Sequence, residues 1–204
     1  MTHPLPAERK RALREEMLAR RKRLTASERE EASLAIAERV ASLPAFAAAR
    51  TVALYASMGA EVSTAEIARR AHAAGKRLAW PRLAPGALRL TFAACPPGEL
   101  VSGRAGTREP PPDAPAVPIS EIDCALVPGV AFDERGGRLG RGRGHYDATL
   151  GALPRRAVRV GLAFEVQLRA EVPREAHDAS LDVVVTERRV VLARPGAGGA
   201  PSGG

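Results

Sequence analysis

Apolar residues recur at helical spacing in the first part of the chain. Residues 8–24 carry a stripe of Leu and Met among many arginines, which predicts a basic amphipathic helix. Ser27 and Glu30 have the spacing of a capping box, and apolar positions continue at helical intervals through residues 32–43. Pro44 is expected to end this second helix, because proline lacks the N–H that helix continuation requires.

A third helix is expected at residues 65–74. Ser63 or Thr64 can cap its first turn, and Gly75 follows its last residue, as glycine commonly does at helix ends. One apolar run precedes this helix and another follows it. The order strand, helix, strand predicts a βαβ unit with parallel strands.

Apolar, partly β-branched runs mark the expected strands. They occupy residues 51–57, 77–80, 88–93, 123–132, 157–164, 181–187 and 188–192. Runs that are apolar throughout are typical of strands covered on both faces. The pattern predicts one three-layer α/β domain over residues 1–194, with a mostly parallel sheet between helices. Residues 95–118 are crowded with Pro and Gly and predict irregular structure, and residues 195–204 predict a disordered Gly-, Pro- and Ser-rich tail.

Composition narrows the class of protein. The 204 residues include 31 Lys and Arg against 23 Asp and Glu, a net charge of +8, so the expected partner is an anion: nucleic acid, a membrane surface or a phosphorylated small molecule. A mean hydropathy of −0.15 excludes an integral membrane protein and a fully disordered chain. Cys95 and Cys124 lack C-x-x-C spacing, which argues against a zinc ribbon, a redox pair or a disulfide scaffold. The first residues of the chain carry charges where a signal peptide would have an apolar stretch, which predicts a cytoplasmic location.

The chemistry is concentrated in residues 138–144, RLGRGRG, which follow an apolar strand and precede a helix-like stretch that begins near His145. Glycine lets backbone N–H groups approach phosphate oxygens, arginine supplies paired donors, and a helix N-terminus adds partial positive charge. The segment has neither the lysine of the common phosphate loop nor the third glycine of the dinucleotide motif. It predicts a phosphate site of another kind, with a flexible turn or an RNA-binding segment as alternatives.

The wider pattern F-D-x-x-G-x-R-L-G-x-G-x-G-x-Y-D, from Phe132 to Asp147, resembles the signature of the 5-formyltetrahydrofolate cyclo-ligase family. Residues 10–14, K-R-A-L-R, resemble the family's N-terminal nucleotide-contacting element. Glu61 in the segment GAEVST is similar to the family's folate-binding glutamate. Order and spacing agree along residues 8–187.

This resemblance implies a fold like that of the sugar-isomerase and CoA-transferase group. It also implies ATP- and Mg²⁺-dependent ring closure of 5-formyltetrahydrofolate to 5,10-methenyltetrahydrofolate, with release of ADP and phosphate. ATP, the substrate's glutamate tail and any polyglutamate extension are anionic, so the net positive charge of the chain would attract these ligands. We expect a monomer with no nucleic-acid or membrane partner.

The resemblance assigns roles to particular residues. ATP contacts are implied for Lys10, Arg11, Ala12, Leu13 and Arg14, and for Arg138, Leu139, Gly140, Arg141, Gly142, Arg143, Gly144, His145 and Tyr146. Folate contacts are implied for Glu61, Gly142, Gly144, His145 and Tyr146. The implied catalytic residues are Arg141, Arg143 and Tyr146, and the implied Mg²⁺ ligands are Asp147 and Asp182.

Structural alternatives exist for several assignments. Lys10 and Arg14 can form a solvated helix face, and Glu61 can be an ordinary loop acid. Asp147 can cap a helix, while Asp182 can be a strand-edge charge paired with an arginine.

Alternatives also exist for the function as a whole. One is a nucleic-acid-binding module, which an aromatic content of 3% disfavours. Another is an ATP-dependent ligase with a different substrate. His145 departs from the family, which usually has an aromatic residue there, most often tyrosine. An imidazole can still stack and hydrogen-bond.

Overall fold

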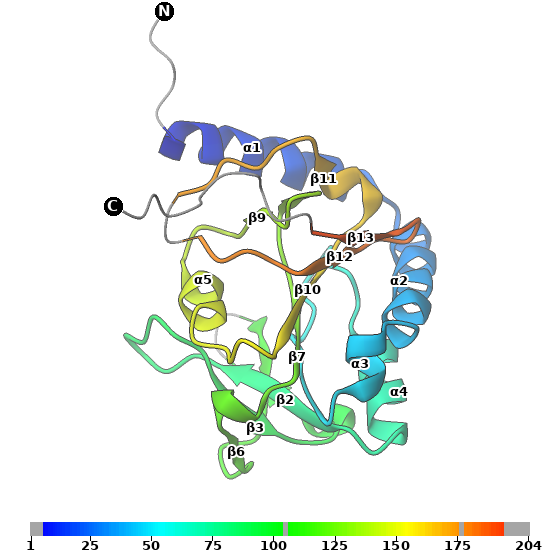
Figure 1. Ribbon diagram of the computed structural model, residues 1–204, viewed down its shortest axis with the longest axis vertical. Helices are drawn as coiled ribbons and strands as arrows, with labels where there is room; N and C mark the ends of the chain where they lie inside the picture. The colour runs from blue at the N-terminus through cyan, green and yellow to red at the C-terminus, as the bar shows by residue number, and fades with distance from the viewer. Residues whose placement is uncertain (1–5, 104–105, 176–177, 194–204) are drawn as a thin grey trace, which may run out of the picture.

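A central sheet of eight strands organises the molecule (Figure 1). The computed structural model describes residues 6–103, 106–175 and 178–193, so the predicted tail at 195–204 lies outside the described residues. In spatial order the strands are β13 (Val190–Leu192), β12 (Val183–Val185), β10 (Val158–Leu162), β7 (Cys124–Val127), β1 (Thr51–Ala53), β2 (Arg77–Arg82), β3 (Thr91–Ala94) and β6 (Ala116–Val117). The five strands from β12 to β2 are parallel, and the strands outside them pair antiparallel. The predicted mostly parallel sheet is confirmed.

Helices cover both faces of this sheet. They are α1 (Pro6–Lys22), α2 (Ala26–Ala41), α3 (Pro44–Ala48), α4 (Ala65–Ala73) and α5 (His145–Leu150), with 3-10 turns η1 (Pro97–Glu99), η3 (Ile119–Glu121) and η4 (Glu165–Gln167). Figure 1 shows α2, α3 and α4 along one side of the sheet and α5 on the other. This arrangement confirms the predicted three-layer α/β fold class. No helix in the described ranges is long and apolar enough to span a membrane.

The strands are apolar throughout because they bury side chains on both faces. Val52 and Leu126 pack with Ile36 of α2 in one core cluster, whereas the adjacent Ala53 packs with Leu150 of α5 in another. Successive strand residues point to opposite faces, so each strand contributes to both clusters.

A small sheet extends the fold beside α1. It pairs β11 (Leu168–Arg169) with β8 (Ala131–Asp133) and β8 with β9 (Arg138–Leu139). Met17 of α1 packs against Val130 and Leu139 in a third cluster. This packing fixes α1 against β9, the strand that leads into the glycine-rich loop.

Three local predictions need correction. The capping box of α2 uses Thr25 and Glu28 instead of Ser27 and Glu30; the Thr25 hydroxyl accepts from Glu28 N, and the Glu28 carboxylate accepts from Thr25 N. The run at 123–132 forms two strands, β7 and β8, because Pro128 interrupts it. The predicted third helix is confirmed as α4, but Thr64 at its N-cap donates its hydroxyl to Tyr55 O instead of capping.

The irregular stretch from 95 to 118 is more ordered than its composition predicts. It forms β6 and a two-stranded ribbon, β4 (Val101–Ser102) with β5 (Arg108–Glu109). The ribbon brings β5 to the edge of the pocket described next.

Candidate active site

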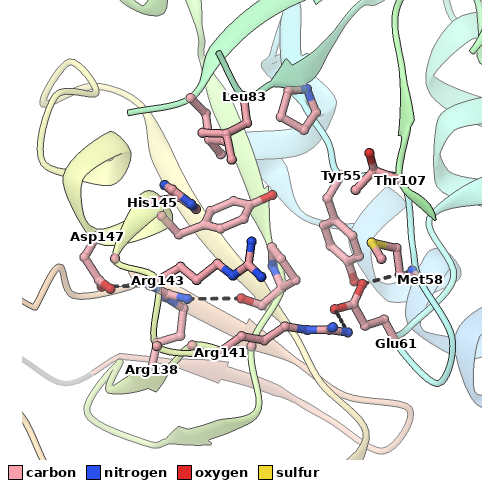
Figure 2. A pocket seen from close by; sticks show the side chains of 18 of the residues that line it. Tyr55, Met58, Glu61, Leu83, Thr107, Arg138, Arg141, Arg143, His145 and Asp147 are labelled. Carbon is pink, nitrogen blue, oxygen red and sulfur yellow. Dashed lines mark hydrogen bonds and ion pairs between the residues drawn. The ribbon is translucent and has the colours of Figure 1, made fainter. Parts of the chain in front are cut away.

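A cavity of about 560 Å³ opens where the parallel strands β1, β2 and β7 end (Figure 2). Tyr55 and Ala56 follow β1, Arg82 ends β2, and Pro128 follows β7; all line the cavity. Ligands of open α/β sheets bind at the carboxyl ends of the strands. The cavity therefore lies where the fold class places its ligands.

The predicted glycine-rich loop forms one wall of this cavity. All residues from Arg138 to Asp147 line it. Gly142 and Gly144 have φ angles of +93° and +72°, which side-chain-bearing residues rarely adopt. Gly144 is the N-cap of α5, so the loop ends at the start of this helix.

Helix α1 contributes two cations to the same wall. The Arg14 Nε donates to Gly140 O at 2.9 Å, which ties the helix to the loop. Lys10 Nζ lies 2.6 Å from both Glu175 Oε2 and Asp178 Oδ2. Burial by itself would lower the Lys10 pKa, but the hydrogen bonds and charges of Asp178 and Glu175 outweigh burial and raise it. Lys10 is therefore a buried, firmly protonated cation at the pocket edge.

Arg138 and Asp147 form an ion pair beneath the loop. Arg138 Nη2 donates to Asp147 Oδ1 at 2.7 Å, and the Arg138 side chain is only 2% exposed. Its guanidinium lies 5.7 Å from the centre of the Tyr146 ring, and its Nε has no hydrogen-bond partner among the described residues. The pair fixes the two ends of the loop relative to each other.

Glu61 faces the loop from the other side of the pocket (Figure 2). Its Oε1 accepts from Arg141 Nη2 at 2.9 Å, and its Oε2 accepts from the backbone N–H of Met58 at 3.0 Å. Arg143 also lines the pocket, and it has no ion pair or hydrogen bond within the described part of the chain. Of the three loop arginines that line the pocket, Arg138 and Arg141 are therefore ion-paired, and Arg143 has no ion pair among the described residues.

Two tyrosines complete the middle of the pocket. Tyr55 donates its hydroxyl to Val62 O at 2.9 Å. Burial raises the pKa of Tyr55 and that of Tyr146 well above the ordinary value of a phenol. Both hydroxyls therefore stay protonated near neutral pH and act as hydrogen-bond donors, not as bases.

His145 joins the loop to another segment. Its Nδ1 lies 3.0 Å from Leu88 O, and the hydroxyl of Thr149, one turn further along α5, accepts from Leu90 N. These contacts hold residues 83–90, the connection between β2 and β3, against the start of α5.

Some predicted site residues do not reach the pocket. Arg11 and Ala12 are exposed, and Leu13 packs in the α1 cluster with Met17. Asp182 precedes β12, at the amino ends of the parallel strands, and it accepts from Arg159 N at 2.7 Å. Its carboxylate also lies 3.6 Å from Arg159 Nη1. The structure therefore separates Asp182 from Asp147 and supports its alternative role as a strand-edge charge paired with an arginine.

Other residues line the pocket without having been predicted. They are Tyr55, Ala56, Met58, Pro81, Arg82, Leu83, Leu90, Thr107, Arg108, Glu109, Pro128, Gly129 and Asp178. For residues after β1, β2 and β7, position at the end of an apolar run was an available signal. Thr107, Arg108 and Glu109 had none, because they lie in the stretch read as irregular.

The acids of this pocket fit a Mg²⁺ ion that is shared with substrate phosphates. Asp147 uses Oδ1 for Arg138, and Oδ2 has no hydrogen-bond partner among the described residues. Asp178 also lines the pocket. No group of three or more His, Cys, Asp or Glu residues in the described ranges could hold a metal alone. Mg²⁺ commonly uses one or two carboxylates together with phosphates.

The fold is that of an α/β protein with a mostly parallel sheet and a cationic glycine-rich loop at the carboxyl ends of its strands, an arrangement that suits anionic ligands. A model of the 5-formyltetrahydrofolate cyclo-ligase family matches residues 6–187. The chain belongs to this family and is an enzyme of the ligase class, which confirms the resemblance of its sequence motif.

Individual relatives agree with this assignment. The 5-formyltetrahydrofolate cyclo-ligase of Escherichia coli K12 is 38% identical over 175 residues, which are 84% of this chain and 96% of the relative. That of Mycolicibacterium smegmatis is 36% identical over 71% of this chain and 77% of its own length. The NMR structure of Aquifex aeolicus 5,10-methenyltetrahydrofolate synthetase superposes with a TM-score of 0.80 at 32% identity, covering 95% of this chain and 97% of that one.

Proposed function

We propose that this enzyme uses ATP and Mg²⁺ to convert 5-formyltetrahydrofolate to 5,10-methenyltetrahydrofolate, ADP and phosphate. The observation that carries the proposal is a single pocket with two chemically different walls. One wall consists of the glycine-rich loop and α1, which suit a nucleotide. The other contains Tyr55, Met58 and Glu61, which suit a flat, polar-edged ring.

The nucleotide wall suits phosphates because it combines backbone donors with several cations. Gly142 and Gly144 permit close approach of phosphate oxygens to the loop backbone. Arg14 and Arg143 lack a carboxylate partner in the described chain and can pair with phosphate oxygens. Lys10 supplies a further fixed positive charge at the edge.

The reaction needs phosphorylation because a formamide oxygen is a poor leaving group. The formyl oxygen attacks the γ-phosphorus, and the bond from this phosphorus to the bridging oxygen breaks, releasing ADP. Nitrogen 10 then attacks the activated formyl carbon and loses its proton to the departing phosphate. The carbon–oxygen bond breaks, phosphate leaves, and the methenyl bridge forms.

The residues act in this sequence by holding the reactants and by stabilising charge. Arg143, and Arg141 once it leaves Glu61, can pair with the transferring phosphoryl group, whose oxygens gain charge in the transition state. The protonated Tyr146 hydroxyl can donate to an oxygen of the same group. No side chain needs to serve as a general base, because phosphate accepts the proton.

We propose Asp147 and Asp178, which line the pocket beside the glycine-rich loop and α1, as the acids that would hold Mg²⁺. Asp178 Oδ2 also pairs with Lys10 Nζ. When bound, Mg²⁺ neutralises charge on the phosphates and orients them for in-line transfer. Asp182 takes no part in this proposal, because it lies at the other end of the strands.

Glu61 is proposed to bind the pterin ring. A carboxylate can accept two N–H groups from the edge of such a ring. The backbone N–H of Met58 already orients one oxygen of Glu61, while Arg141 occupies the other. Folate binding would therefore release Arg141 toward the phosphates, which couples the two walls of the pocket.

The test is direct. Purified protein with Mg²⁺, ATP and 5-formyltetrahydrofolate should form the absorbing methenyl product with one ADP for each turnover. Folded protein that gives no absorbance change across neutral pH would contradict the proposal. We also propose a monomeric, cytoplasmic enzyme; tight RNA binding that weakens steeply with added salt would instead favour a nucleic-acid-binding module.

A further inference from the structure

Two arginines that line the pocket outside the glycine-rich loop and α1 have no acid partner among the described residues. Arg82 and Arg108 line the cavity, and neither lies within 4.0 Å of a carboxylate in the described ranges. Lys10, Arg138 and Arg141, by contrast, are all ion-paired. Unpaired arginines that face a cavity indicate an anionic ligand, because a guanidinium is always protonated and favours a planar anion.

The backbone holds both guanidinium groups in place. Arg82, the last residue of β2, donates from Nη2 to the carbonyl oxygens of Pro110 and Pro111, just beyond β5. Arg108, the first residue of β5, donates from Nη2 to Leu100 O at 2.6 Å. Each arginine is anchored through one nitrogen, so its other N–H groups remain available at a low cost in side-chain entropy.

These arginines come from elements other than the two that form the phosphate wall. Arg82 ends β2 and Arg108 begins β5, and Figure 2 shows the labelled Leu83 and Thr107 apart from Arg138. The phosphate wall has its own cations without a carboxylate partner in the described chain, Arg14 of α1 and Arg143 of the glycine-rich loop, for the nucleotide. Two further unpaired arginines in the same cavity therefore indicate a second anionic group on the bound ligands, in addition to the nucleotide phosphates.

We propose that Arg82 and Arg108 form a carboxylate subsite for the glutamate end of the folate substrate. The inference rests on the proposed function and adds a subsite to it. The pterin and benzoyl parts of 5-formyltetrahydrofolate are uncharged, whereas its glutamate carries two carboxylates. Two arginines can each pair with one carboxylate, and bidentate contacts of this kind supply both affinity and orientation.

The experiment compares two substrates in three variants. The first substrate is 5-formyltetrahydrofolate, and the second is the same molecule with a neutral carboxamide in place of glutamate. Arg82→Gln and Arg108→Gln are each tested, with Arg89→Gln as the matched control. Arg89 is exposed on the same connection and does not line the pocket. Thermal melting establishes that every variant is folded.

We expect Arg82→Gln and Arg108→Gln each to raise KM for the full substrate about tenfold, the effect of losing one charged hydrogen-bonded contact. KM for the carboxamide analogue and KM for ATP should stay at the wild-type value, and Arg89→Gln should change none of the three. Equal losses on both substrates, no loss on either, or a rise confined to the KM for ATP would overturn the subsite.

Binding without turnover separates this inference from the proposed function. Calorimetric titration of the wild type and both variants with each folate in the absence of ATP measures the same contrast. If the wild type binds 5-formyltetrahydrofolate in preference to the carboxamide analogue but does not cyclise it, the proposed function fails and the subsite stands. If the wild type binds both with equal affinity, the subsite fails whatever the turnover.

Discussion

Arg138 and Asp147 meet across the glycine-rich loop, with Arg138 Nη2 2.7 Å from Asp147 Oδ1. Arg138 belongs to β9 and Asp147 to the first turn of α5, so the pair closes the loop at its base. Because the Arg138 side chain is 2% exposed, Asp147 compensates a buried charge as well as facing the pocket. Its carboxylate therefore has two roles that substitution should separate.

Asp147→Asn should reduce both stability and activity. The amide oxygen can still accept from Arg138 but no longer compensates its charge, so we expect a loss of about 1–3 kcal/mol in the free energy of unfolding. Turnover should fall on the order of a hundredfold at low Mg²⁺, with partial recovery when Mg²⁺ is raised. Chemical denaturation and a Mg²⁺ titration of the rate measure the two effects separately.

Asp182→Asn is the control for that variant, since it removes the same charge at the amino ends of the strands. Its Mg²⁺ dependence should match that of the wild type. A wild-type Mg²⁺ dependence in Asp147→Asn would remove Asp147 from the proposed metal site, and an altered one in Asp182→Asn would contradict the separation of the two acids seen here.

Gly142→Ala should weaken ATP binding. At a φ of +93° an alanine is strained by about 1–2 kcal/mol, and its Cβ would lie 3.3 Å from Arg14 Cζ. We expect lower stability and a KM for ATP raised severalfold because Arg14 is displaced. Gly98→Ala is the matched control: Gly98 has open space at its Cβ, so this change should be neutral or stabilising by up to about 1 kcal/mol. Equal behaviour of the two variants would show that the loop conformation is unimportant.

The ion pairs of Lys10 should stabilise the folded protein at neutral pH, and this stabilisation should be lost at alkaline pH. Burial lowers its pKa, but Asp178 and Glu175 raise it further, so the folded-state pKa lies above the unfolded value of about 10.4. The contribution is complete below about pH 10.4 and is lost as pH rises through the folded-state pKa. Lys10→Met should therefore be less stable than the wild type at neutral pH, with a gap that narrows above about pH 10.4.

Urea unfolding between pH 7 and 11.5 measures this gap. Lys22→Met, which removes an exposed lysine at the end of the same helix, is expected to show a much smaller difference. A constant gap for Lys10→Met across the whole range would mean that its ion pairs with Glu175 and Asp178 do not stabilise the fold.

Arg14→Gln and Glu61→Gln should affect different substrates. Arg14 is tied to the loop through Gly140 O, so its loss should mainly raise the KM for ATP. Glu61 is the acid of the folate wall, so its loss should mainly raise the KM for the folate. Steady-state kinetics with each substrate varied in turn measures the split, and equal shifts of both constants would refute the division of the pocket.

Much of the fold could be predicted because its signals are local. The runs at 51–57 and 157–164 are apolar throughout, and β1 and β10 are indeed parallel strands buried on both faces. The loop from Arg138 to Gly144 could be recognised because its chemistry lies in consecutive residues. The predicted helix boundaries were close to the observed ones, although Thr25 and Ser27 both stand at the start of α2 and the sequence pointed to the wrong one as the capping residue.

The direction of the parallel strands could have shown that the two aspartates lie at opposite ends of the sheet. Asp147 follows the loop that leaves the carboxyl ends of the strands, whereas Asp182 precedes β12 and so lies at their amino ends. Both aspartates resemble metal ligands in the sequence, because each is a carboxylate close to an apolar run. The sequence pattern alone does not distinguish an acid at the amino end of the sheet from one at the carboxyl end. Only the parallel pairing of β10 with β12 makes that order decisive.

By itself the sequence determined the βαβ order, the phosphate-type loop and the family. The tertiary structure alone decided which distant side chains share the pocket. Arg108 and Asp178 come from segments with no local signal, whereas Arg82 stands at the end of an apolar run. All three meet the loop because strand pairing and the β4–β5 ribbon bring these segments together. It also decided which charges are already paired, since Lys10 and Arg141 find carboxylates 165 and 80 positions away in the chain. Such pairing depends on distances in space, which periodicity and composition do not encode.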